Sequence, residues 1–121
     1  MAKVMIIDDS GTARSRTRLA LEEALHTAIE ASGGEEALKF LSQMNDIQLV
    51  LCDFNMPKMD GLEVCKKIKA NPKLAHIKLL MLTTESSPEM RAKGKEIGIL
   101  GWVTKPFELT KLIAAINKLV I

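Results

Sequence analysis

Short apolar runs alternate with helix-like stretches along the chain, and this alternation restricts the fold more than any other feature. Apolar runs occupy residues 3–7, 27–31, 47–52, 77–82 and 99–104. The first, third and fourth runs are almost continuously apolar, which is typical of strands covered on both faces in a parallel sheet. Helix-like stretches follow at residues 12–25, 34–44, 61–70, 87–97 and 108–120.

A strand-then-helix order repeated in this way indicates a parallel sheet with right-handed crossover connections. We therefore expect the α/β class, with a doubly wound five-stranded parallel sheet and helices on both faces. The chain has 121 residues, a length that buries enough surface for one core without disulfides or metals. We interpret residues 1–121 as a single domain.

Several residues predict where the helices begin and end. Ser10 or Thr12 can cap the first helix, Asp60 the third and Ser87 the fourth, and Gly98 stops the fourth.

The first helix is the least amphipathic one. Arg16 and Thr17 fall where an apolar face is expected, so we expect its packing to rest on four small or apolar residues: Ala13, Ala20, Leu21 and Ala24. Arg14, Arg16 and Arg18 are interpreted as a solvated face, with a docking edge for a partner protein as the alternative.

Composition argues against several classes of protein. Hydrophobic residues are 47% and charged residues 26%, which is typical of a globular domain. The net charge of +2 is too small to indicate nucleic-acid binding. Cys52 and Cys65 form neither a disulfide framework nor a metal-binding spacing, which favours a reducing compartment. With no leader or membrane span in the sequence, we expect a cytoplasmic protein.

Acidic side chains follow two of the predicted strands. Asp8 and Asp9 come directly after the first strand, and Asp53 ends the third. In a doubly wound sheet, ligands bind beyond the carboxyl ends of the strands. Ionised carboxylates about 5 Å apart repel by roughly 3 kcal/mol per pair at an effective dielectric near 20, so a proton or a cation is needed there. Oxygen ligands suit Mg²⁺. The alternative is that Asp8 and Asp9 only cap the helix and Asp53 lies in a turn.

Two more strand ends carry groups that bind anions. Thr83 ends the fourth strand and Lys105 follows the fifth. A hydroxyl and an ammonium can each donate a hydrogen bond to a phosphoryl oxygen. Either residue alone has an ordinary explanation, but together with the acids they indicate a site for a phosphoryl group.

These motifs are shared with a known family. The pair "DD" after the first strand, the pattern "DFNMPKMDG" from Asp53 to Gly61, Thr83, and "KPF" from Lys105 to Phe107 resemble the receiver domain of two-component response regulators. The resemblance spans essentially the whole chain. It implies the flavodoxin-like strand order 2-1-3-4-5 and a cis peptide bond before Pro106.

The resemblance also implies roles for the acidic residues. Asp53 would accept a phosphoryl group from a kinase histidine. Asp9 would bind Mg²⁺ directly and Asp8 through water, and the remaining protein ligands would be the Asp53 carboxylate and the backbone carbonyl of Asn55.

Further roles follow from the same resemblance. Thr83 and Lys105 would bind the phosphoryl oxygens, and Thr83 and Trp102 would form the switch, although the family more often has Tyr or Phe in place of this Trp. Asn55 and Glu85 would set the lifetime of the phosphorylated state, which we expect to be short. Thr84 would limit access to the site.

At the level of the whole protein, we expect a monomeric signalling switch that assists its own phosphorylation and is not otherwise an enzyme. Its partners would be a histidine kinase and a target protein, with no nucleic acid and no membrane. Chemotaxis, with the flagellar motor switch as target, is favoured. A phosphorelay or developmental receiver is the alternative.

Two rival classes are weighed against this interpretation. A flavodoxin-type binder could use Ser10, Gly11 and Thr12 to hold a phosphate, but the neighbouring acids would repel it, and aromatic residues are only 3% of the chain. A phosphohydrolase with an aspartyl nucleophile usually needs a general acid two residues further on, and Asn55 cannot serve as one.

Overall fold

Parallel strands form one sheet in the order β2-β1-β3-β4-β5, in a computed structural model that describes residues 1–84 and 86–120. The strands are β1 (Lys3–Ile7), β2 (Thr27–Ala31), β3 (Leu49–Asp53), β4 (Lys78–Thr83) and β5 (Ile99–Thr104). The helices are α1 (Gly11–Glu23), α2 (Gly34–Gln43), α3 (Gly61–Ala70), α4 (Pro88–Ile97) and α5 (Leu109–Leu119). The expected α/β class and strand order are confirmed. None of the helices in the described ranges is long and apolar enough to cross a membrane.

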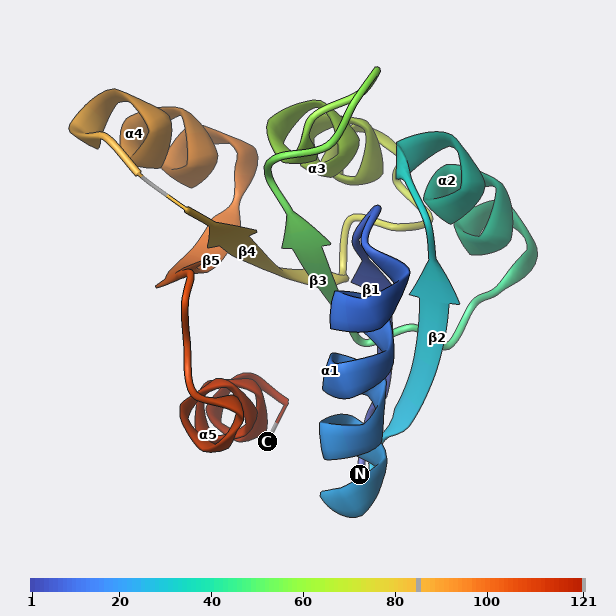
Figure 1. Cartoon of the computed structure of the whole chain (residues 1–121). Helices are drawn as coiled ribbons and strands as arrows, with labels where there is room; N and C mark the ends of the chain where they lie inside the picture. The colour runs from blue at the N-terminus through green and yellow to red at the C-terminus, as the bar shows by residue number, and fades with distance from the viewer. Residues whose placement is uncertain (85, 121) are drawn as a thin grey trace.

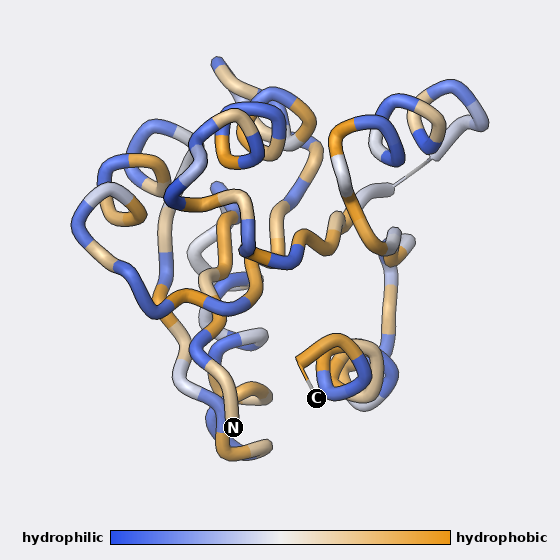
Figure 2. Tube along the Cα trace, turned by 180° about the vertical axis from the view of Figure 1, so that it is seen from behind, coloured by the Kyte–Doolittle hydropathy of each residue, from blue (hydrophilic) through white to orange (hydrophobic). Residues whose placement is uncertain are grey.

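The helices cover the sheet on both sides. Figure 1 shows α2, α3 and α4 on one face and α1 and α5 on the other. Figure 2, drawn from behind, shows hydrophobic and hydrophilic colours alternating around the turns of α5, as in an amphipathic helix that packs with one side. The sheet is therefore the middle of three layers.

The central strands β1, β3 and β4 are apolar between their end residues because they contribute to two cores. Side chains alternate between the faces of a strand. In β1, Met5 and Ile7 belong to the core under α2, α3 and α4, whereas Val4 and Ile6 belong to the core under α1 and α5. A strand buried on both faces can carry a polar side chain only at its end.

Most helix ends lie where the sequence places them. The side chains of Ser10, Asp60 and Ser87 each accept a hydrogen bond from the backbone N–H three residues further on, as helix caps do. Gly98 ends α4 with a φ of 109°, a left-handed conformation that favours glycine.

The packing of α1 differs from the expectation in one residue. Thr17 is buried together with Leu21, whereas Ala13, Ala20 and Ala24 are only half-buried. The Thr17 hydroxyl donates a hydrogen bond to the Ala13 carbonyl at 3.1 Å, which satisfies its polar group inside the protein. A polar residue therefore occupies the buried face of α1 without an unpaired donor.

Gly61 at the start of α3 generates a prediction about stability. A Cβ at this position would lie 2.8 Å from the Asp53 carbonyl oxygen and 2.9 Å from the Phe54 Cα. Because these are backbone atoms, they cannot move aside as a flexible side chain can. We expect Gly61→Ala to lower the free energy of unfolding by about 1–3 kcal/mol in urea titrations.

Gly11 is the matched control, because it is also the first residue of a helix that follows a side-chain cap. The nearest atom to a Cβ there is an Arg14 nitrogen at 3.8 Å, an ordinary contact. Gly11→Ala should keep or slightly raise the stability, because alanine restricts the unfolded chain. Equal stability of the two variants would contradict the close packing of α3 on β3.

Candidate phosphoryl and metal site

Three carboxylates converge at the carboxyl edge of the sheet. Ile7 of β1 pairs with Cys52 of β3, so the residues that follow them, Asp8 and Asp53, leave neighbouring strands at the same level. Asp8, Asp9 and Asp53 each place a carboxylate oxygen within 4.8 Å of the others. Asp8 and Asp53 are only 4% and 2% exposed, and Asp9 is exposed. The convergence predicted from the strand ends is present in the structure.

The backbone holds two of these carboxylates in place. The Ser10 N–H donates to Asp8 Oδ1 at 2.9 Å, and the Asn55 N–H donates to Asp53 Oδ1 at 3.3 Å. The cap of α1 is Ser10, and Asp53 is the last residue of β3. The alternative of two capping acids and a turn residue is therefore wrong for Asp8 and Asp53.

Lys105 brings the opposing charge to this cluster. Its Nζ lies 3.0 Å from Asp53 Oδ1 and 3.8 Å from Asp8 Oδ2. Its backbone N–H donates to the Thr83 carbonyl at 2.7 Å, which joins the ends of β4 and β5. The Lys105–Pro106 peptide bond is cis, as the resemblance implies.

The electrostatic balance of the cluster is incomplete. Burial raises the pKa of the Asp53 carboxyl above its ordinary value; the hydrogen bond from Lys105 opposes this rise, and the charge of Asp8 adds to it. One ammonium therefore does not compensate for two buried carboxylates. A group that brings positive charge into the cluster would bind favourably.

Asn55 links two loops beside the site. Its side-chain oxygen accepts hydrogen bonds from the Thr84 N–H at 3.4 Å and from the Thr84 hydroxyl at 3.3 Å. Thr83, the preceding residue, is fully buried at the end of β4. The link between Asn55 and Thr84 was missed by sequence reasoning. Glu85, the other residue expected to set the lifetime, lies outside the described residues.

Trp102 packs against a glycine of α4. The residue is half-buried, and a Cβ at Gly94 would lie 2.5 Å from Trp102 Cζ2. Because Gly94 has no side chain, it leaves the space that the indole ring of Trp102 occupies. The sequence placed Trp102 on β5 but contained no signal that Gly94 would face it.

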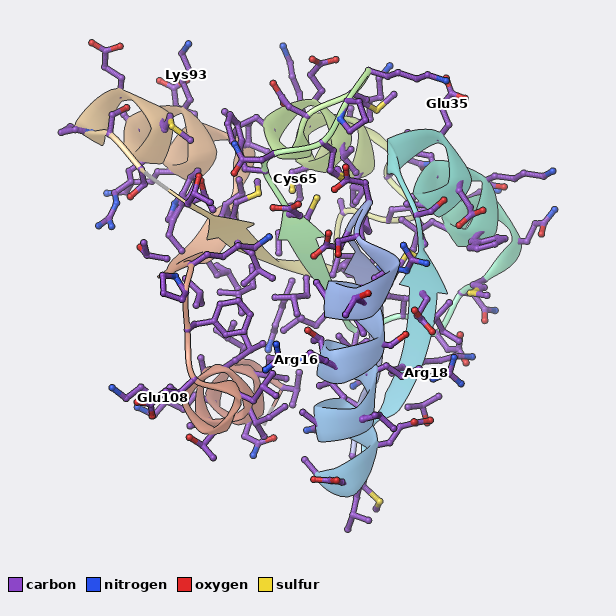
Figure 3. The ribbon with its side chains drawn as sticks, viewed as in Figure 1. Arg16, Arg18, Glu35, Cys65, Lys93 and Glu108 are labelled. Atoms are coloured by element: carbon purple, nitrogen blue, oxygen red, sulfur yellow. The ribbon has the colours of Figure 1, made fainter. Side chains whose placement is uncertain are left out.

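The arginines of α1 do not form one solvated face. Arg14 and Arg18 both bind Glu30 on β2, at 3.1 Å and 3.0 Å. Figure 3 shows Arg16 leaving α1 on the side of α5, and Arg18 on the side of β2.

Arg16 and Lys105 line a cavity of about 380 Å³ between α1 and the start of α5, directly beside Asp8. Asp8 is the member of the acidic cluster that lines this cavity.

The fold and the site together define a class of protein: a doubly wound domain whose carboxyl edge carries clustered acids and a lysine. Residues 4–117 match the family described as the response regulator receiver domain. The chain belongs to this family, and it is a phosphorylatable response regulator of two-component signalling.

Similar proteins include chemotaxis regulators. A chemotaxis protein CheY homolog of Campylobacter jejuni is 33% identical over 106 residues, which are 87% of this chain and 82% of the relative. Chemotaxis protein CheY-3 of Vibrio cholerae is 32% identical over 118 residues, which are 97% of this chain and 90% of the relative. The structure of V. cholerae CheY4 superimposes with a TM-score of 0.92 at 34% identity and covers 98% of both chains.

The raised pKa of Asp53 predicts how stability depends on pH in EDTA. The folded protein holds the proton of the Asp53 carboxyl more tightly than the unfolded chain does. The stabilisation that this protonated carboxyl gives to the folded state is therefore fully present below the ordinary carboxyl pKa. It is lost as the pH rises through the raised pKa. We expect Asp53→Asn to unfold at higher urea concentration than the wild type at neutral pH. The difference should shrink as the pH falls toward about 4.

Paired urea titrations of the two proteins across this pH range measure the difference directly. A difference that widens on acidification would mean that the pKa of Asp53 is lowered in the folded state, and it would contradict the electrostatic description of the cluster.

Proposed function

We propose that Asp53 accepts a phosphoryl group from a histidine kinase and that the chain acts in chemotaxis by controlling the flagellar motor. One observation carries the proposal: a carboxylate at the end of a buried strand lies within 4.8 Å of two other carboxylates and 3.0 Å from a lysine ammonium. This is the charge pattern that an incoming phosphoryl group and a divalent cation require together.

The donor atoms fit Mg²⁺ as the cation. They are carboxylate oxygens on three neighbouring aspartates, which are the hard ligands that Mg²⁺ prefers. Asp9, Asp8 and Asp53 would hold the ion with the backbone carbonyl of Asn55. When bound, Mg²⁺ supplies positive charge that compensates the oxygens of the phosphoryl group.

The residues of this chain divide the phosphoryl transfer among themselves. An Asp53 oxygen forms the new bond to phosphorus while the phosphorus–nitrogen bond to the kinase histidine breaks and its electron pair stays on the imidazole. The rigid end of β3 orients the carboxylate, which lowers the entropic part of the barrier. Lys105 and Thr83 donate hydrogen bonds to the phosphoryl oxygens.

The output follows from a change at the ends of β4 and β5. We infer that Thr83 turns toward the bound phosphoryl group and that Trp102 changes its position in response. Because Trp102 packs on Gly94, such a change would alter the contact between β5 and α4. A partner that binds this surface would then distinguish the two states.

Chemotaxis is favoured over a phosphorelay or developmental role by the names of the similar proteins from C. jejuni and V. cholerae. We propose that the chain is a cytoplasmic monomer that assists its own phosphorylation and dephosphorylation and catalyses no other reaction. Asn55, which bonds to Thr84 beside the site, would set a short lifetime of the phosphorylated state together with Glu85.

The proposal predicts cation-dependent uptake of radiolabel from a labelled acyl phosphate. Wild type should become labelled in Mg²⁺ and stay unlabelled in EDTA. Lys105→Ala should slow the uptake about 10²- to 10³-fold, because it removes a donor aimed at the phosphoryl oxygens.

The chemotaxis assignment has a test of its own. In beryllofluoride, a phosphoryl mimic, wild type should bind a purified flagellar motor-switch protein.

Lys93→Ala is the matched control, because Lys93 is an exposed lysine on α4 that points away from the sheet (Figure 3). It should be labelled as fast as the wild type. Uptake that persists in EDTA, or equal rates for the two lysine variants, would contradict the proposed site. Equal motor-switch binding with and without beryllofluoride would contradict the chemotaxis assignment alone.

A further inference from the structure

Arg14 joins the acidic cluster to the neighbouring strand. Its Nη1 donates a hydrogen bond of 2.7 Å to the backbone carbonyl of Asp8, and its Nε donates one of 3.1 Å to Glu30 of β2. The side chains of Arg14 and Glu30 are largely covered, with 19% and 24% of their surfaces exposed. We propose that Arg14 is a positioning residue that holds the peptide between Asp8 and Asp9 for cation binding.

The position of this one carbonyl affects both acids. The peptide group is planar, so fixing the Asp8 carbonyl also fixes the plane that leads to the Asp9 Cα. The other polar groups of Asp8 are bound as well: its N–H donates to the Ala31 carbonyl at 3.2 Å, and its Oδ1 accepts from the Ser10 N–H. Arg14 adds a restraint on the backbone carbonyl of Asp8, just beyond Ile7, the last paired residue of β1, whereas Lys105 contacts the Asp8 carboxylate.

Two effects of Arg14 on cation affinity have opposite signs. As a positive charge near the acids, it weakens the binding of a cation. As a clamp on their backbone, it strengthens binding, because groups that orient metal ligands typically contribute about 10- to 100-fold in affinity. Because Glu30 lies 3.1 Å from Arg14 and offsets part of its charge, we expect the clamp to be the larger effect.

Two substitutions separate the clamp from the charge. Arg14→Lys keeps the charge, but a single ammonium cannot reproduce the fork that reaches both partners. Arg14→Gln removes both charge and fork. Arg18→Gln is the matched control, because Arg18 binds the same Glu30 at 3.0 Å from the next turn of α1. Its guanidinium group pairs with Glu30 and Glu22, whereas that of Arg14 reaches the Asp8 carbonyl.

The measurement is the dissociation constant of Mg²⁺ alone for each unphosphorylated protein, obtained by titration calorimetry. Thermal unfolding in EDTA checks that every variant is folded. We expect Arg14→Lys and Arg14→Gln to weaken Mg²⁺ binding about ten-fold. Arg18→Gln should bind as the wild type does, although it loses the same ion-pair partner.

The outcomes separate this inference from the proposed function on which it rests. Unchanged affinity in Arg14→Lys with tighter binding in Arg14→Gln would show a charge effect only and overturn the positioning role. Equal weakening in the Arg14 and Arg18 variants would show general loosening of α1 and overturn it too. A wild type that binds no Mg²⁺ would overturn the cation site itself together with this inference.

Discussion

Buried like charge at the carboxyl edge of the sheet is the constraint on which the rest of this structure depends. Asp8 and Asp53 are almost fully covered. Among the described residues, Lys105 is the positively charged side chain that contacts both of them. Such a cluster costs folding free energy unless positive charge is added, because burial and the neighbouring carboxylate both disfavour the ionised form of Asp53. The stability lost at this edge is what makes the site receptive to a cation and a phosphoryl group.

The fold makes this cluster possible by separating the stable part of the sheet from the reactive part. The inner strands are apolar between their ends and contribute to cores on both faces. Their ends are the places where a polar group reaches the edge without crossing a core. The order β2-β1-β3-β4-β5 then makes the first and third strands neighbours, which brings Asp8 beside Asp53 across a long stretch of sequence.

Much of this arrangement can be predicted from the sequence because it depends on backbone periodicity. The apolar runs predict where the strands lie, and the residue after each run is then expected at a strand end, whichever way its side chain points. Contacts that depend on side-chain direction cannot be predicted in this way. The bond from Arg14 to the Asp8 carbonyl, the link between Asn55 and Thr84, and the packing of Trp102 on a glycine all required the three-dimensional structure. Each of these contacts joins residues whose spacing along the sequence matches neither the helix period nor the strand period.

The central claim is that the Asp53 carboxylate is the group that becomes phosphorylated. The direct measurement is to phosphorylate the protein in Mg²⁺, reduce the acyl phosphate with borohydride, and locate the reduced residue by peptide mass spectrometry. We expect reduction at Asp53 and at no other carboxylate. Reduction at Asp8, Asp9 or Asp60, with Asp53 intact, would contradict it.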